Sequence, residues 1–407
     1  MREQTARSQS SLNPDDSNDG KPLLYGLSLV SFLFLLGFGI ALPSLPRAVE
    51  ELGGSELDVG LVISIWALSY VAMGVPAGAL LDRHDLRVTI PAAMVGNCFV
   101  GALYALGTSL PFLLVGRLLQ GVLESFVWAG IFGLVSFKFP HSRTGALAIV
   151  TVFSSLGFSI GPTFNGLLFA SAPARFGLIP VIATSLFSAI LTIVLFHSRS
   201  VYHVRGGRRA PGVMSVVHSV DSVVALALVM TGIMGGFEGI VQAHNSDLLT
   251  GIGLPVALSG LLLSSYLVSA LASRSSLPYT YRFFQRRYYP ALSFLTALLV
   301  LLLGTYVIQS SWTLILQWIV IGALLGVNWI TFQALIANTL GEKAPSTAMG
   351  IYNLSWGLGY MSMPPMVGLV TTRTGGHLAY VSLEILVTIG LLCGLVFFFT
   401  LRGERSF

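Results

Sequence analysis

Twelve long apolar runs, separated by short polar breaks, constrain this chain more than any other feature of its sequence. Each run has about 20 residues, which is the length that a helix needs to cross a bilayer. Of the 407 residues, 54% are hydrophobic and only 10% are charged, so no stretch is left for a sizeable soluble domain. The sequence therefore predicts an all-α membrane protein with twelve transmembrane helices. The predicted spans are residues 23–45, 59–81, 88–107, 110–136, 145–169, 176–197, 219–242, 255–273, 290–308, 312–340, 347–370 and 378–400.

The distribution of Lys and Arg predicts the orientation. Eighteen of the 22 Lys and Arg residues, Arg274 among them, lie in the segments on the N-terminal side of the membrane. The other side holds Arg47, Arg175 and Arg373, and Arg117 lies within a span. Cytoplasmic segments carry the excess of positive charge, so both termini are expected in the cytoplasm of a cell with this protein in its inner or plasma membrane. The net charge of +5 then reflects this topology and contact with lipid headgroups, and no nucleic-acid partner is expected.

The polar segment 199–215 separates six predicted spans from six and is expected to be a cytoplasmic linker. The polar N-terminal residues have the composition of a disordered tail. Cys98 and Cys393 lie in spans far apart in the sequence, so neither a disulfide framework nor a metal site is predicted. The expected division is a disordered cytoplasmic tail 1–22, an N-terminal six-helix bundle 23–198, the linker 199–215, a C-terminal six-helix bundle 216–401 and a cytoplasmic tail 402–407.

The two halves resemble each other. Residues 156–167 align without a gap on residues 358–369, and an offset one residue smaller places Gly121 on Gly322 and Trp128 on Trp329. Two related bundles are what an alternating-access transporter needs, because they can rock around a site at their interface. A chance match in sequence rich in Gly and Leu is the alternative.

A short polar loop joins the second and third spans and carries Gly78, Asp82, Arg83 and Arg87. Its pattern Gly-x-x-x-Asp-Arg-x-x-x-Arg resembles the loop signature of the major facilitator superfamily. The resemblance implies a conformational latch, in which Asp82 meets the positive N-terminal end of the eleventh helix near residues 346–347. An ordinary cytosolic loop that only obeys charge topology is the alternative.

A second motif lies in the fifth span, with Gly157, Gly161, Pro162, Asn165 and Gly166. It resembles the Gly-Pro motif of the antiporter branches of this superfamily. Together with the span count and the repeat, the resemblance covers essentially the whole chain. It implies a major facilitator fold, with two pseudo-symmetric six-helix bundles, and it points to the twelve-helix drug:proton antiporters.

The chain departs from the family pattern at several positions. Asp85 stands where the loop signature usually has Gly, and Asn165 stands where the fifth-span motif often has a second Gly. Val150 replaces that motif's upstream glycine. The matching loop of the second half, residues 273–289, lacks the Gly-x-x-x-Asp-Arg pattern, so any latch is expected in one half only.

The fourth span carries Arg117, Gln120, Gly121, Glu124 and Trp128 on one helical face. The pattern Arg-x-x-Gln-Gly resembles another signature of the superfamily, and the resemblance implies that this face lines the central cavity. In the tenth span the corresponding residues are apolar, so charge is expected in one half only.

Glu124 lies near the middle of its span, where an ionisable group is costly and is a functional candidate. Burial disfavours the anion of a carboxyl group, whereas a nearby cation favours it. We therefore expect Glu124 to carry the proton, or to share that role with recognition of a substrate cation, and Arg117 to bias its protonation. A structural Arg–Glu pair that holds helices together is the alternative.

Substrate contacts are expected from polar and aromatic side chains at helical spacings on possible inner faces. Aromatic walls with a carboxylate suit lipophilic cations or amphipathic neutral molecules. Each aromatic side chain has plain packing or interfacial anchoring as its alternative, and Glu238 could equally be an interfacial acid at the outer mouth. The candidates are Gln120, Trp128, Trp66, Tyr70, Glu238, Asn328, Trp329, Asn353, Trp356 and Tyr360.

The sequence thus predicts a secondary active transporter that exports a small lipophilic or cationic, drug-like molecule in exchange for protons. It is expected to act as a monomer, driven by a proton gradient and without a cofactor. The alternative within transport is a permease or exporter of a sugar or another metabolite. A lipid-modifying membrane enzyme would need a cluster of His, Asp or Ser at one membrane face, which the sequence does not show, and no phosphate-binding loop is present for ATP coupling.

Overall fold

The protein is an assembly of long helices. The computed structural model describes residues 14–81, 84–139, 143–197, 220–251, 258–284, 291, 294–299, 311–340, 345–374 and 378–403. Eight helices within these ranges are long and apolar enough to cross a membrane. The helices are α2 (Pro14–Ala41), α3 (Ser44–Glu51), α4 (Glu56–Leu81), α5 (Leu86–Leu106), α6 (Leu110–Lys138), α7 (Arg143–Phe169), α8 (Ala174–Leu178), α9 (Pro180–His197), α11 (Ser222–Gly251), α12 (Leu258–Phe284), α14 (Ser311–Leu340), α15 (Pro345–Thr374) and α16 (Leu378–Gly403).

Most helices agree with the predicted spans to within a few residues, and the all-α class is confirmed. Two differences concern the ends of the chain's first span. Helix α2 already begins at Pro14, within the segment expected to be a disordered tail, and the short helix α3 follows it. The linker and most of the ninth predicted span lie outside the described residues. The division into two bundles with the bounds given above stays a prediction.

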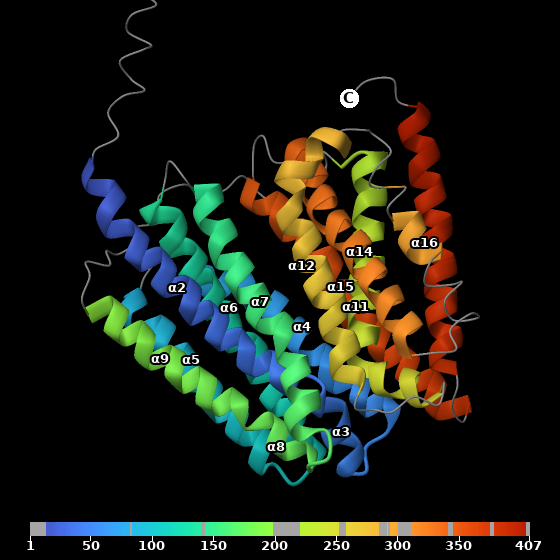
Figure 1. Ribbon diagram of the computed structural model, residues 1–407, viewed down its shortest axis with the longest axis horizontal. Coiled ribbons are helices and arrows are strands. Elements are labelled where there is room, and N and C mark those ends of the chain that lie inside the picture. The colour runs from blue at the N-terminus through green and yellow to red at the C-terminus, as the bar shows by residue number, and fades with distance from the viewer. Residues whose placement is uncertain are drawn as a thin grey trace, which may run out of the picture.

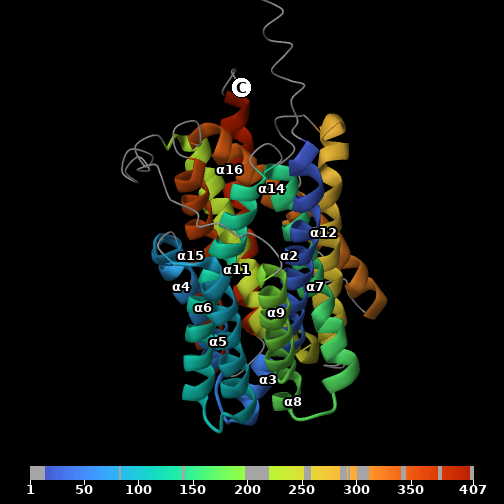
Figure 2. The same ribbon diagram turned by 90° about the vertical axis from the view of Figure 1, so that its left-hand side faces the viewer.

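The helices form two groups that lie side by side (Figure 1). Helices α2 to α9 make up one group and α11 to α16 the other, and a view turned by 90° shows all long helices running roughly parallel (Figure 2). The groups meet mainly through two helix pairs, α4 with α15 and α7 with α12, and α11 adds smaller contacts with α4 and α3. In Figure 1 the ribbons of the two groups are closest at the end that carries α3 and α8, and farther apart at the end where α2 begins and α16 finishes. We call these the closed end and the terminal end.

Mirrored glycine contacts hold the two groups together toward the closed end. Gly60 of α4 lies against the backbone of Pro364 in α15, and Gly260 of α12 lies against the backbone of Pro162 in α7. A Cβ atom at either glycine would overlap with the facing carbonyl group. Each group therefore contributes one glycine and one proline-containing helix, and only glycine permits this approach.

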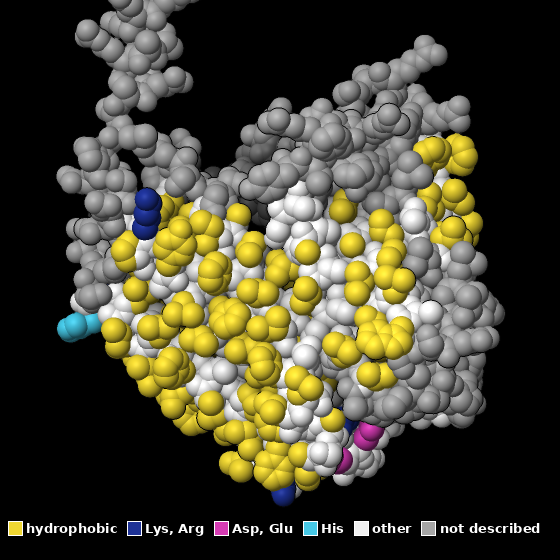
Figure 3. All heavy atoms as spheres, in the orientation of Figure 1, with side chains coloured by type: hydrophobic (Ala, Val, Ile, Leu, Met, Phe, Trp, Pro, Cys, Tyr) yellow, Lys and Arg dark blue, Asp and Glu magenta, His cyan; other side chains and the backbone are white. Residues whose placement is uncertain are grey.

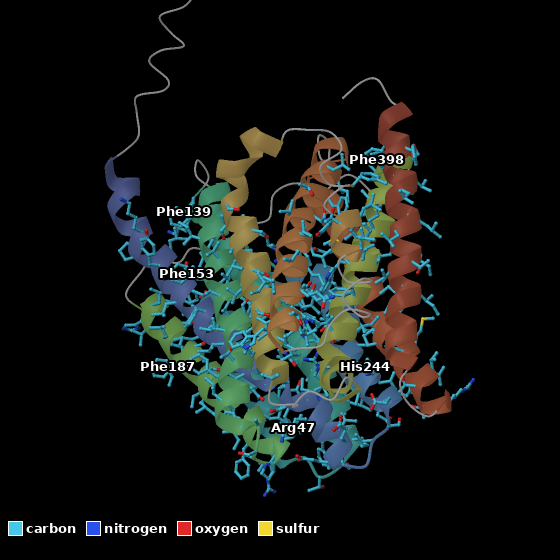
Figure 4. All side chains as sticks on the ribbon, turned by 45° about the vertical axis from the view of Figure 1, so that its right-hand side comes forward. Arg47, Phe139, Phe153, Phe187, His244 and Phe398 are labelled. Atoms are coloured by element: carbon cyan, nitrogen blue, oxygen red, sulfur yellow. The ribbon has the colours of Figure 1, made fainter. Side chains whose placement is uncertain are left out.

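A buried histidine ties three helices together at the same end. His244 is fully buried in α11, its Nδ1 lies 3.1 Å from Oε2 of Glu56 in α4, and its Nε2 lies 3.2 Å from the carbonyl oxygen of Pro364 in α15. The backbone of α11 kinks at His244. Figure 4 shows His244 and Arg47 toward the closed end and Phe398 toward the terminal end. His244 therefore bridges the two groups where they are closest.

The outer flank of the helices is apolar. Hydrophobic side chains cover most of the described surface in Figure 3, and charged side chains appear near its two ends. Phe99, Leu167 and Phe187 are 69%, 76% and 62% exposed, respectively. Exposure of such side chains over this breadth is what a hydrocarbon environment stabilises.

Candidate functional site

Helix α6 carries the first cluster of buried polar groups. Arg117, Gln120 and Glu124 are only 4%, 3% and 2% exposed, and all three lie on the face that contacts α4. Gly121 lies between them and permits the close approach, because a Cβ atom there would overlap with the Ser69 side chain and the carbonyl oxygen of Trp66. Because Gly121 has no side chain, α4 and α6 approach closely enough for the indole N–H of Trp66 to reach Glu124.

We call Tyr104, Gln120, Glu124 and Trp66 the first relay, because hydrogen bonds join them in that order. The Tyr104 hydroxyl group donates to Oε1 of Gln120 at 2.6 Å, and Nε2 of Gln120 donates to Oε1 of Glu124 at 2.6 Å. Nε1 of Trp66 donates to the second carboxyl oxygen of Glu124 at 3.0 Å. Both oxygen atoms of this buried carboxyl group therefore have a donor.

Arg117 influences Glu124 through an intermediate side chain. Its guanidinium group donates to Oε1 of Gln120 at 2.7 Å, and also to the carbonyl oxygens of Val62 at 2.9 Å and Ile63 at 3.0 Å. Since Oε1 of Gln120 accepts from both Arg117 and Tyr104, the amide nitrogen is directed at Glu124. In the part of the chain that the structure describes, Arg117 and Glu124 act through Gln120 and form no direct ion pair.

The second group of helices holds a matching set of side chains. Nε1 of Trp356 donates to Oε2 of Glu238 at 3.2 Å, and Nε2 of Gln242 donates to Oε1 of Glu238 at 3.3 Å. The Tyr360 hydroxyl group donates to Oε1 of Gln242. We call these four residues the second relay. Gly235, three residues before Glu238, lies against the carbonyl oxygen of Trp356, as Gly121 lies against that of Trp66.

The second relay is more open than the first. Glu238 is partly exposed, whereas Glu124 is sealed, and the Trp side chains of both relays are partly exposed. Arg274 of α12 lies near Glu238 and stacks on Trp329, with its Cζ atom 4.5 Å from the ring centroid. Its buried Nε has no hydrogen-bond partner within the described ranges. The expectation that charge is confined to one half is therefore wrong, and Arg274 lies within a helix rather than in a polar connection.

Aromatic rings connect the two relays. The ring of Tyr360 lies 5.7 Å from that of Trp66 and 5.0 Å from that of Trp356, measured between centroids. Trp66 also stacks on Tyr70 at 5.5 Å, and Trp356 contacts Trp329 at 5.7 Å. The Tyr360 hydroxyl group also lies near Arg117. Tyr360 therefore belongs to the second relay and touches the first.

Three candidates from the sequence occupy other surroundings. Trp128 packs against Phe34 and Phe132, with ring centroids 6.2 Å and 5.5 Å apart, in the core of the first group. Asn353 is exposed on α15, and Asn328 is fully buried on α14 beside Trp329. None of these three has a hydrogen bond to either carboxyl group of the relays among the described contacts.

The motif of the fifth span positions α7 against α2. A Cβ atom at Gly157 or Gly161 would overlap with the α2 backbone, and Nδ2 of Asn165 donates to the carbonyl oxygen of Ile40 at 2.6 Å and to Oγ of Ser44 at 2.7 Å. Asn165 thus satisfies polar groups where α2 ends. Pro162 and Gly166 of the same motif face Gly260 in the other group.

The latch motif is described only in part. Gly78 lies in α4, and the backbone N–H of Arg87 donates to Oδ1 of Asp85 at 2.9 Å, which begins α5. Asp85, the departure from the family pattern, therefore caps a helix. Asp82 and Arg83 lie outside the described residues, so the latch stays a prediction.

Sequence reasoning missed Tyr104, Arg274 and His244 as members of polar clusters, and it placed Gln242 on the helical face of Glu238 without giving it a role. A signal for Gln242 was present, because a Gln lies four residues from the Glu in both α6 and α11. The other three residues bind partners on different helices, and the spacing of residues along one helix does not predict such contacts.

Comparisons with known proteins agree with this architecture. The family model described as Major Facilitator Superfamily matches residues 27–281 and 222–407. The chain is 24% identical over 220 residues to the quinolone resistance protein NorA of Staphylococcus aureus, and 27% identical over 164 residues to multidrug resistance protein 1 of Bacillus subtilis. These alignments cover 53% and 40% of this chain and 56% and 42% of the relatives. The chain thus spans about half the length of the curated relatives it matches.

Solved structures show the same fold. The nucleoside transporter NupG is 15% identical and has a TM-score of 0.78, with 94% of this chain and 100% of that chain covered. A bacterial homologue of the human lysosomal transporter Spinster, in an inward-facing and unoccupied conformation, is 15% identical and has a TM-score of 0.73. The comparison covers 96% of this chain and 98% of that chain. At this identity the likeness shows the fold alone, and it confirms the predicted one. By the family match over both halves, the chain belongs to the major facilitator superfamily and is a multi-pass membrane protein.

Proposed function

We propose that this protein exports a small lipophilic or cationic molecule in exchange for protons. Glu124 carries the proposal, because it is a sealed carboxyl group in the interior of a membrane transporter and has a donor on each oxygen atom. Intramembrane acids of this kind mark proton and ion pathways. Two distant relatives whose names refer to quinolone or multidrug resistance support a drug-like substrate for this chain.

The first relay supports proton binding rather than simple packing. Hydrogen-bond donors on both oxygens stabilise a carboxylate, while its two acceptor atoms still permit a bound proton. Arg117 stands one side chain away and does not neutralise Glu124 by a direct ion pair. The carboxyl group can therefore change its charge without breaking a salt bridge, which is what a reversible proton carrier needs.

The packing of the two groups supports alternating access. With both termini cytoplasmic, the closed end faces outward, and the mirrored glycine contacts and His244 seal that side. The conformation is then inward-facing. Opening the outer side requires the contact between His244 and Glu56 to separate, because the two residues belong to different groups.

Purified full-length protein in proteoliposomes, with a pH dye inside and tetraphenylphosphonium or ethidium as the probe, tests the proposal. Movement of the probe should be accompanied by proton movement in the opposite direction. In the Glu124→Gln variant this proton movement should fall to the level of protein-free vesicles, because a glutamine amide neither gains nor loses a proton at the pH of the assay.

A matched control is Glu50→Gln, which removes an exposed carboxyl group of α3. It should leave proton exchange at the wild-type level. Continued proton movement in Glu124→Gln would contradict the role of Glu124. Probe movement without any pH change in the wild-type protein would instead favour a uniporter.

A further inference from the structure

The two relays present the same hydrogen-bond chemistry in different surroundings. In each, a Tyr hydroxyl group orients a Gln, the Gln amide and a Trp indole donate to the two oxygens of a Glu, and a Gly three residues earlier permits the contact. Because these four features coincide, we expect Glu238 to switch between a charged and a neutral state as Glu124 does. The two carboxyl groups differ in how far each is exposed.

The two guanidinium groups are held differently, although each lies over an indole ring, with Cζ of Arg117 5.5 Å from the ring centroid of Trp66 and Cζ of Arg274 4.5 Å from that of Trp329. Arg117 uses three hydrogen bonds to close the first relay, and Glu124 is 2% exposed. Arg274 lies over the ring of Trp329, its buried Nε has no hydrogen-bond partner among the described residues, and Glu238 remains partly exposed. Glu238 therefore keeps part of its surface exposed, whereas Glu124 does not.

The surroundings of Glu238 suit an organic cation. The rings of Trp356, Tyr360 and Trp329 adjoin one another beside the carboxyl group, and the guanidinium group on Trp329 shows that a planar cation packs against this wall. A cation held by a carboxylate and aromatic faces gains from both when water is excluded.

We infer that the two relays divide the work: Glu238 is the residue that binds the cationic group of the substrate, and Glu124 is the residue that holds the proton. This inference rests on the proposed function and names the substrate class of its site, an aromatic organic cation. Tyr360 lies in the second relay and contacts Trp66 of the first. A molecule bound at Glu238 can therefore influence Glu124 through the side chain of Tyr360. Arg274 opposes the incoming charge and thereby limits affinity for cations.

Equilibrium binding to the detergent-solubilised full-length protein tests the inference without relying on transport. The probes are tetraphenylphosphonium, a lipophilic cation, and triphenylphosphine oxide, an uncharged analogue of similar shape. The readout is the ratio of their Kd values. Glu238→Gln should lower the preference for the cation about tenfold, the range expected for one charge contact beside aromatic rings. Glu50→Gln is the control.

Arg274→Met provides an independent arm should Glu238→Gln not fold. Removing the positive charge should tighten binding of tetraphenylphosphonium about threefold to tenfold and leave triphenylphosphine oxide unaffected. An unchanged ratio in Glu238→Gln, an equal or larger fall in Glu124→Gln, or weaker cation binding in Arg274→Met would overturn the inference. Loss of proton exchange is a separate readout, so failure of the proposed function is distinguishable from failure of this assignment.

Discussion

The first and second relays share their residue types and bonding pattern, and differ in how each is enclosed. In the first, Arg117 ties α6 to the backbone of α4 and Glu124 is sealed. In the second, Arg274 rests on an aromatic ring and Glu238 is partly exposed. The difference shows that the same bonding partners can surround a carboxyl group in a sealed site or in a more open one. Under the proposal above, the contacts of the neighbouring cation distinguish a closed proton site from an open ligand site.

The largest effect should come from replacing Arg117, with the same replacement of Arg274 as the comparison. Arg117→Met removes two charge-assisted hydrogen bonds to the backbone of α4 and one to Gln120 of its own helix, so we expect a loss of about 3–5 kcal/mol in the free energy of unfolding. Arg274→Met removes chiefly a contact with Trp329 and should cost about 1 kcal/mol. Unfolding of both variants in mixed detergent micelles measures the difference. Equal losses would contradict the distinction between a guanidinium group bonded to the α4 backbone and one that packs on an aromatic ring.

A smaller effect is expected from the two relay glycines. In Gly121→Ala or Gly235→Ala the new methyl group meets the carbonyl oxygen of the relay Trp, and such overpacking costs about 1–3 kcal/mol. The indole N–H then moves away from its carboxyl group. Gly121→Ala should impair proton exchange in proteoliposomes, and Gly235→Ala should impair binding of tetraphenylphosphonium.

Gly133→Ala is the matched control on α6, because a Cβ atom there would meet open space. It should be neutral or slightly stabilising, since Ala favours helix more than Gly does. A result in which Gly121→Ala and Gly235→Ala lose the same function would contradict the division between the relays.

The smallest effect should come from the two tyrosines that orient the glutamines. Tyr104→Phe and Tyr360→Phe each remove one hydrogen bond, worth about 1 kcal/mol, and keep the ring. Tyr360→Phe should weaken the effect that bound tetraphenylphosphonium has on proton release, because this hydroxyl group connects Gln242 with the surroundings of Arg117. Tyr104→Phe should act on proton exchange alone. Tyr25→Phe, at a 55% exposed position, is the control, and identical effects of all three variants would count against the connection.

The helical spans were predictable because a bilayer leaves few options for a long apolar segment. Backbone groups in hydrocarbon must bond within the segment, so an apolar run of this length becomes a helix. The same logic exposed Glu124, since a charge in such a run is rare and the 3.6-residue period places Arg117 and Gln120 beside it. Glu238 was visible as an acid, but its equivalence to Glu124 was not, because the repeat relates α6 to α14 while the second acid lies in α11.

By itself, the sequence determined the helical membrane class, the position of most spans and the face of α6 that carries Arg117, Gln120 and Glu124. These features depend on composition and on spacing along one helix. Only the tertiary structure decided that Trp66 and Trp356 are the matching donors, that Arg274 packs on Trp329 inside the second group, and that His244 bridges the groups. Each of those contacts joins residues on different helices. Which helices pair depends on where glycines allow two backbones to approach, and this cannot be read from one helix alone.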